Sequence, residues 1–147
     1  MKLGDNMKKG FTLIELLAVL VVLAVLAIIA VPSVLKIVDD SKMGTFKDGG
    51  LGILNAAKQS YVKYAGREMV VHMDENIIYL DGEKTTDTIE YKGTKPKGGY
   101  VMITKDGKTS MAIYNDNYCA YKRETDDEVS AKRINSSSEC TLDKITD

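Results

Sequence analysis

The chain has 147 residues, of which 28% are charged, and its formal net charge is −1. This length fits one modest domain with an extension. The balanced charge argues against a protein whose overall basic field attracts nucleic acid. The apolar residues gather near the N-terminus, where residues 16–31 read LLAVLVVLAVLAIIAV without a polar side chain. The remainder is mostly polar, which is typical of a part that lies in water.

The apolar segment is long enough to cross a membrane. Residues 11–31 are interrupted only by Thr12 and Glu15. As a helix this segment is about 31 Å long, and the hydrocarbon core of a bilayer is about 30 Å thick. It is preceded by three lysines, Lys2, Lys8 and Lys9. Positive residues before a span favour a cytoplasmic N-terminus, so we expect the rest of the chain outside the cell.

We expect the apolar segment to continue into a long helix over residues 11–65. Its second half is amphipathic, with apolar residues spaced by three and four positions: Leu54, Ala57, Tyr61 and Tyr64. Two places weaken it. Pro32 lacks a backbone N–H, which predicts a kink or melted turn just before it. Four glycines between residues 44 and 52 predict a bend or break. Gly66 suits the C-terminal cap.

From residue 67 onward the patterns are those of strands and turns. Short strands are indicated at residues 69–73, 77–80, 88–92 and 118–122. Residues 100–104 and 109–114 alternate around a Lys-Asp-Gly-Lys turn, which predicts a hairpin. One of its faces is apolar, with Val101, Ile103, Met111 and Ile113. Residues 124–147 are polar and are predicted to be loop.

The two cysteines, Cys119 and Cys140, lie in the part expected outside the cell. An even count in an oxidising compartment predicts a disulfide, and two reduced thiols are the alternative. A Cys119–Cys140 bridge would tie the polar tail to a strand. It would close a loop of about 20 residues, a constraint of roughly 3 kcal/mol in the chain-entropy model.

The elements together predict an α+β fold, in which a long N-terminal helix packs on a small antiparallel β-sheet. The apolar half of the helix, residues 11–31, spans the membrane, and the amphipathic half packs on the sheet. We expect three segments: a leader over residues 1–10, the helix over residues 11–65, and an extracellular β-rich head over residues 66–147.

The sequence Lys-Lys-Gly-Phe-Thr-Leu-Ile-Glu at residues 8–15 resembles the processing signal of the type IV pilin family. That family also includes the pseudopilins of type II secretion and of DNA uptake. The resemblance implies that a membrane-bound prepilin peptidase cuts after Gly10 and methylates the new N-terminus, Phe11. It also implies that Glu15 pairs with the Phe11 amine of a neighbouring subunit. Pro32 matches the proline that commonly interrupts the pilin helix.

The residues agree with this resemblance on physical grounds. A glycine before the cut leaves room for a peptidase to approach the backbone. A carboxylate at the edge of a membrane span, such as Glu15, is costly and usually needs a partner. Two alternatives remain for the N-terminus. One is a secretory signal cut near residues 27–30, and the other is a plain signal anchor with Glu15 at the cytoplasmic interface.

No enzyme, cofactor or metal site is indicated. His72 is the only histidine, and no nucleophile with orienting partners accompanies it. Residues 115–117 and 126–128 carry oxygen donors that would suit calcium, but neither segment follows an EF-hand pattern, and solvated acidic loops are the preferred interpretation. The lysines between residues 92 and 108 are accompanied by the acidic Glu90 and Asp106, which dilute the positive field, so no nucleic-acid partner is expected.

The favoured function is a structural subunit of an extracellular type IV pilus that supports adhesion, motility or aggregation. A pseudopilin of a secretion or competence apparatus is the first alternative. A membrane-anchored surface binding domain that never polymerises is the second. The resemblance implies as partners other copies of the chain and other pilins, the prepilin peptidase, the pilus assembly platform, and the membrane before assembly.

Overall fold

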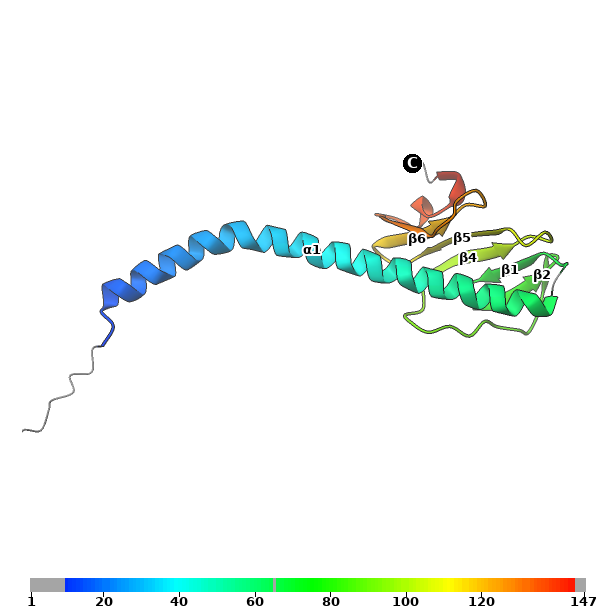
Figure 1. Cartoon of the computed structure of the whole chain (residues 1–147), viewed down its shortest axis with the longest axis horizontal. Helices are drawn as coiled ribbons and strands as arrows, with labels where there is room; N and C mark the ends of the chain where they lie inside the picture. The colour runs from blue at the N-terminus through cyan, green and yellow to red at the C-terminus, as the bar shows by residue number, and fades with distance from the viewer. Residues whose placement is uncertain (1–9, 65, 145–147) are drawn as a thin grey trace, which may run out of the picture. The chain divides into compact units, whose positions relative to one another are not determined.

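A computed structural model describes residues 10–64 and 66–144 (Figure 1). Contacts divide the chain into two units, Met1–Asp39 and Asp40–Asp147, and each is described by itself. The first helix, α1, runs from Leu13 to Tyr61, and a 3₁₀ turn, η1, follows at Val62–Tyr64. Gly66 follows with φ +88°, a conformation that favours glycine after a helix end.

The expected break at the glycines is wrong, because α1 is unbroken between residues 44 and 52. Packing explains why. Gly50 is buried against the sheet, and a Cβ on it would lie 3.1 Å from the Cβ of Ala120 and 3.2 Å from Cε of Met111. Because Gly50 has no side chain, the helix can lie close to the strands. Burial of the neighbouring Ile53 and Leu54 then offsets the weak helix propensity of the glycines. No turn is melted before Pro32 either, and a kink there stays a prediction.

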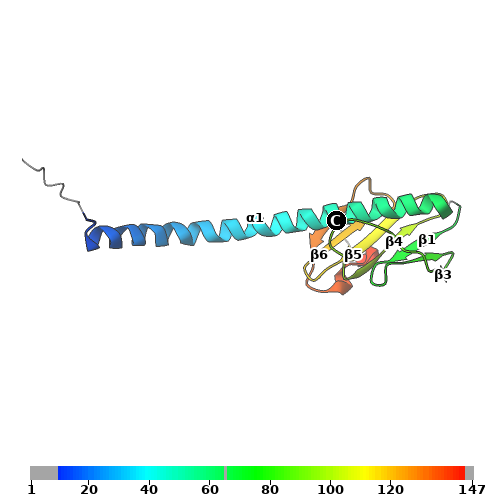
Figure 2. The same cartoon turned by 90° about the horizontal axis from the view of Figure 1, so that it is seen from below.

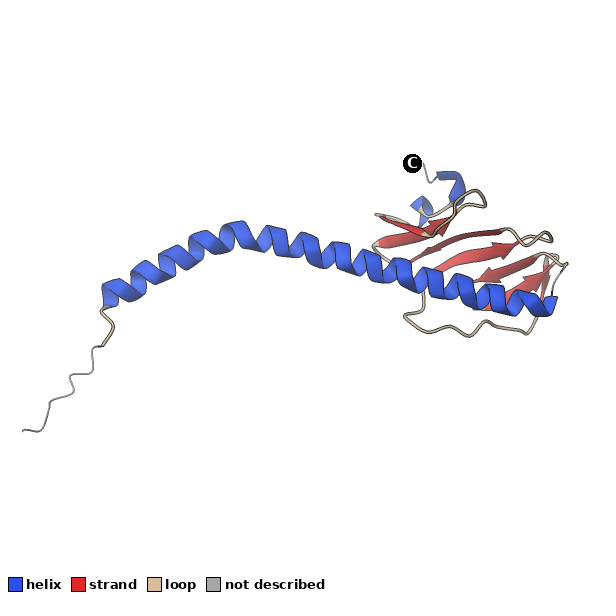
Figure 3. Ribbon diagram, in the orientation of Figure 1, coloured by secondary structure: helices blue, strands red, loops and turns tan. Residues whose placement is uncertain are grey.

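The second unit contains one antiparallel sheet with the strand order β3-β2-β1-β4-β5-β6-β7 (Figure 3). The strands are β1 Met69–His72, β2 Ile77–Leu80, β3 Glu83–Lys84, β4 Gly98–Ile103, β5 Thr109–Tyr114, β6 Tyr118–Lys122 and β7 Ser130–Arg133. The predicted hairpin is confirmed as β4 and β5, with Val101 opposite Met111. Between β2 and β3, Asp81 and Gly82 have φ of 50° and 86°, as a two-residue hairpin turn requires.

One face of the sheet carries the main core, and the second half of α1 covers that face (Figures 1 and 2). Ile53, Leu54 and Ala57 of α1 are at most 2% exposed. They meet the four apolar residues predicted on one face of the hairpin, which are at most 1% exposed. The α+β architecture predicted from the sequence is confirmed, with one long helix packed on a small antiparallel sheet.

The opposite face carries a smaller cluster of buried residues: Ala112, Cys119, Ile134 and Cys140. It is covered by the C-terminal segment, which was predicted to be loop. That prediction is wrong, because β7 pairs with β6 and short 3₁₀ helices follow at Ser137–Glu139 (η2) and Leu142–Lys144 (η3). The buried Val129 and Ile134 on either side of β7 hold its polar residues against the free edge of β6.

The strand expected at residues 88–92 is also absent from the described structure, where this segment is irregular. Its alternating pattern has a different cause. Ile89 is 2% exposed in the main core, and Tyr91 packs against the same core. The side chain of Asn76 donates a hydrogen bond to the carbonyl of Ile89 at 3.0 Å. The apolar side chains of this segment thus pack into the core without forming a strand.

Candidate processing and assembly site

The backbone around the expected cleavage point is open. Gly10 and Phe11 are exposed, and the side chain of Phe11 is 88% exposed. A Cβ added at Gly10 would meet no atom within 4 Å. The described chain therefore leaves room for a side chain at position 10. If a larger residue at position 10 prevents cleavage, the cause would therefore be a poor fit in the enzyme that cuts the chain, and not a clash within the chain itself.

Thr12 and Glu15 form a capping box at the start of α1. The backbone N–H of Glu15 donates to Oγ1 of Thr12 at 3.3 Å, and the backbone N–H of Thr12 donates to Oε2 of Glu15 at 2.9 Å. The Thr12 hydroxyl also donates to Oε2 at 2.9 Å. Such reciprocal bonds satisfy N–H groups that the first helical turn leaves without partners.

The capping box gives Glu15 partners within its own chain. Its carboxylate also lies in the first turn, where the helix dipole favours negative charge. Pairing with the Phe11 amine of another copy would therefore add to, or exchange with, these local bonds, and that pairing stays a prediction. The role of Thr12 was missed in the sequence. Its signal was present, since Thr-x-x-Glu before an apolar run is typical of a capping box.

Among the described residues of the first unit, 10–39, the helix presents an exposed apolar surface. Every large apolar side chain from Phe11 to Val31 is more than half exposed. Across the most apolar window of the helix the mean hydropathy is 3.2, and none of that window is buried. By length and composition this helix can cross a membrane. In water such a surface would be unfavourable, so it needs lipid or other helices around it.

Pro32 lies inside α1, just beyond the apolar segment. Because proline has no backbone N–H, it cannot donate to the carbonyl of Ile28, four residues earlier. One turn of hydrogen bonding is therefore incomplete while the helix continues. The adjacent Ser33 hydroxyl donates to the carbonyl of Ile29 at 3.4 Å. Serine hydroxyls that bond back to the helix in this way often bend helices.

Cys119 and Cys140 form a disulfide, and their Cα atoms lie 5.5 Å apart. Cys119 is in β6 and Cys140 follows η2, so the bond fastens the C-terminal segment to the sheet. Both cysteines are buried in the smaller apolar cluster. Tyr100, Tyr114 and Tyr121 pack against this cluster, as expected for tyrosines that fill a core edge.

Two aspartates, one in the β2–β3 turn and one in the segment after β3, bond to residues near the end of the helix region. Asp81 accepts a hydrogen bond from Nε of Arg67 at 2.8 Å and one from the backbone of Glu68 at 3.1 Å. These bonds hold the pKa of Asp81 below its usual value, the Arg67 bond most strongly. Asp87 accepts a short hydrogen bond from the Tyr64 hydroxyl, which is the main cause of its lowered pKa.

The part of the chain that the structure describes shows no grouping suited to catalysis or metal binding. No three His, Cys, Asp or Glu side chains gather there to hold a metal ion. His72 is exposed on β1, and its ring meets the edge of Tyr79 with centroids 4.7 Å apart. The sequence-predicted residues fall into three places. Gly10, Phe11 and Glu15 lie at or just before the start of α1, Pro32 lies inside that helix, and the cysteines lie in the second unit.

This combination defines a class of protein: an apolar helix suited to membrane insertion, with a processing motif before it, joined to a disulfide-bonded β-rich unit. Residues 5–31 match the family model of the prokaryotic N-terminal methylation motif, which is the type IV prepilin signature. The match supports a protein of the type IV pilin or pseudopilin class, anchored in the membrane as a prepilin. No curated protein and no solved structure matches the chain.

Proposed function

We propose that the chain is a structural subunit of an extracellular type IV pilus. The observation that carries this proposal is the apolar helix surface of the first unit, most of which lies within the matched methylation motif, residues 5–31. Removal of the leader, residues 1–10, keeps that helix on the mature chain, whereas a secretory signal is discarded with its apolar segment. A helix retained in this form gives the subunit both a membrane anchor and a polymerisation surface.

In this proposal the prepilin peptidase cuts between Gly10 and Phe11 and methylates the Phe11 amine. The chain waits in the membrane with its N-terminus in the cytoplasm. The assembly platform then packs the apolar helices into a filament core. Glu15 of one subunit meets the Phe11 amine of the next, so that the carboxylate and the amine neutralise each other away from water.

The head, residues 66–147, would then face outward and contact surfaces or other cells. Its role is structural and adhesive rather than enzymatic. The buried Cys119–Cys140 disulfide supports this placement, since such bonds persist outside the cytoplasm. Burial of the helix against other helices replaces its contact with lipid, and packing between helices can supply the needed attraction.

Electron microscopy of cells that express Glu15→Gln tests this function. The variant keeps the size of the side chain and one acceptor oxygen but removes the charge. We expect the processed protein in the membrane and few or no filaments. Glu15→Asp is the matched control that keeps the charge on a shorter side chain, and it should retain part of the filament yield. Unchanged filament number with Glu15→Gln would refute the pairing.

The wild-type chain separates the pilus from its alternatives. Long surface filaments labelled by antibody to the head support the pilus subunit. Processed chain with no filament beyond the cell envelope would indicate a pseudopilin. Unprocessed chain spread singly over the membrane would indicate an anchored binding domain.

A further inference from the structure

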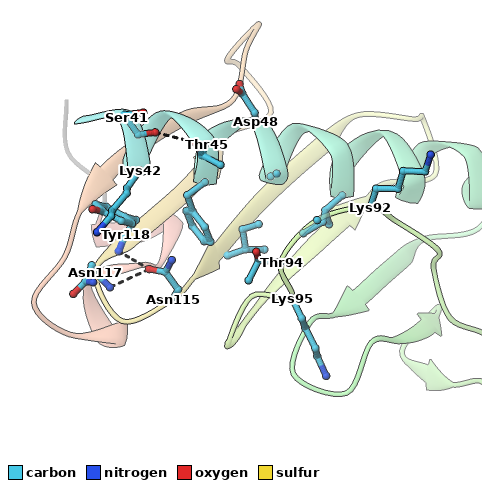
Figure 4. Close-up of a pocket in the computed structure, with 16 residues that line it drawn as sticks. Ser41, Lys42, Thr45, Asp48, Lys92, Thr94, Lys95, Asn115, Asn117 and Tyr118 are labelled. Carbon is cyan, nitrogen blue, oxygen red and sulfur yellow. Dashed lines mark hydrogen bonds between the residues drawn. The ribbon is translucent and has the colours of Figure 1, made fainter. Parts of the chain in front are cut away.

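A groove lies within the second unit, between α1 and the segments that follow β3 and β5 (Figure 4). Its volume is about 720 Å³. The apolar lining comes from Phe46 and Ile53 of α1, Ile113 of β5 and Tyr118 of β6. The ring centroids of Phe46 and Tyr118 lie 6.3 Å apart.

Backbone features keep the groove open. A Cβ on Gly49 would meet no atom within 4 Å, so this turn of α1 leaves space rather than filling it. On the facing side, Oδ1 of Asn115 accepts hydrogen bonds from the backbone N–H groups of Asn117 and Tyr118, at 3.0 and 2.8 Å. These hydrogen bonds stabilise the conformation of the β5–β6 turn, which forms one side of the groove.

The rim of the groove is mainly basic. Lys42 lies on the helix side, and Lys92 and Lys95 lie on the loop side, all three exposed (Figure 4). Asp48 is the acidic residue among those that line it. Within residues 10–64 and 66–144, neither Lys42 nor Lys92 has an ion-pair partner. The rim therefore offers positive charge to an incoming acidic group.

An acidic segment of the same chain lies at the far end of β6. Residues 124–128 read Glu-Thr-Asp-Asp-Glu and are separated from that strand by Arg123 alone. Asp126 accepts a hydrogen bond from the backbone N–H of Arg123 at 2.8 Å, which fixes the turn. Asp127 and Glu128 are exposed, and the described structure gives them no ion-pair partner.

The groove and the acidic segment lie at opposite ends of β6. β6 begins at Tyr118, which lines the groove, and ends at Lys122, just before the acidic segment. Four residue steps along a strand separate these ends by about 13 Å. A head-to-tail contact needs two different surfaces on each subunit, and the groove and the acidic segment are such a pair. A contact of that kind repeats into an open helical array when its rotation does not close a ring.

We propose that the groove receives the acidic segment, residues 124–128, of a second copy of this chain. Asp127 and Glu128 of one head then pair with Lys42 and Lys92 of the next, and the segment shields the partly exposed Phe46 from water. This contact rests on the proposed function as a filament subunit. It adds a specific junction between heads, which fixes their register along the filament.

Charge reversal in cells that express the full chain tests the junction. Lys42→Glu with Lys92→Glu should reduce sheared filament protein at least about tenfold, because like charges would face each other at every junction. Asp127→Lys with Glu128→Lys should do the same. All four substitutions together should restore filaments. Lys58→Glu is the matched control, since Lys58 is an exposed lysine of α1 outside the groove and should leave the yield unchanged.

The outcomes separate the two proposals. Rescue by the fourfold reversal establishes the pairing, because a folding defect would not be repaired by adding two more substitutions. Normal filaments in both double variants would overturn the junction and leave the pilus function standing. Loss in a double variant without rescue in the fourfold variant would also overturn it. Absence of filaments from the wild-type chain would instead overturn the proposed function.

Discussion

Gly50 allows a direct test of how α1 is held on the sheet. The substitution is Gly50→Val, and Gly44→Val is the matched control in the same helix. A side chain at Gly50 would start 3.1 Å from Cβ of Ala120 and 3.2 Å from Cε of Met111, whereas one at Gly44 would meet nothing within 4 Å. Valine and glycine differ by only about 0.3 kcal/mol in helix propensity, so propensity predicts a small gain at both positions.

Packing predicts that the two variants differ. Added atoms in a filled core cost about 1–3 kcal/mol, so Gly50→Val should lower the free energy of unfolding by that amount. Gly44→Val should leave it nearly unchanged or slightly raised. Urea midpoints from pulse proteolysis of the full chain in detergent would measure both. Equal midpoints for the two variants would refute the reasoning, since the close approach of helix and sheet would then not be limiting.

Three further predictions concern the cap, the disulfide and pH. Thr12→Ala removes the capping hydroxyl and should destabilise the first turn of α1 by about 1 kcal/mol. Thr12→Ser should retain the cap. Amide hydrogen exchange in the first turn, measured in micelles, would compare the two variants. Cys119→Ser should lower the stability of the head by about 3 kcal/mol, and the urea midpoint should then no longer respond to reductant. Because hydrogen bonds lower the pKa of Asp81 and Asp87, their contribution to stability should be complete above the unfolded aspartate pKa of about 3.9 and should be lost as the pH falls below it. The urea midpoint should therefore fall at acidic pH, and Asp81→Asn should reduce that fall; an unchanged pH profile in Asp81→Asn would contradict the assignment.

Local patterns were enough to predict much of the fold. The β4–β5 hairpin follows from alternating apolar residues around a turn, and Val101 and Met111 face the core as their positions indicate. The Asp81-Gly82 turn follows from residues that tolerate positive φ. The residues of the candidate processing site could also be predicted, because the sequence motif at residues 8–15, which ends at Glu15, is a specific one.

The failures share one physical origin, which is tertiary packing. The glycine-rich stretch of α1 is helical because Gly50 fits against the sheet, and helix propensity does not report that fit. β7 forms from polar residues because β6 offers it a free edge. The groove was not foreseen because its lining comes from segments far apart in the sequence, of which Phe46 and Ile113 are examples.

The most direct test of the account is the mass of the chain recovered from surface filaments. Filaments sheared from cells and separated from membranes would be analysed by mass spectrometry of the intact chain under non-reducing conditions. We predict a chain that begins at Phe11 with one added methyl group and carries the Cys119–Cys140 bond. A surface chain that begins after residue 25, or one that still contains residues 1–10, would contradict processing at Gly10 and with it the assignment as a pilus subunit.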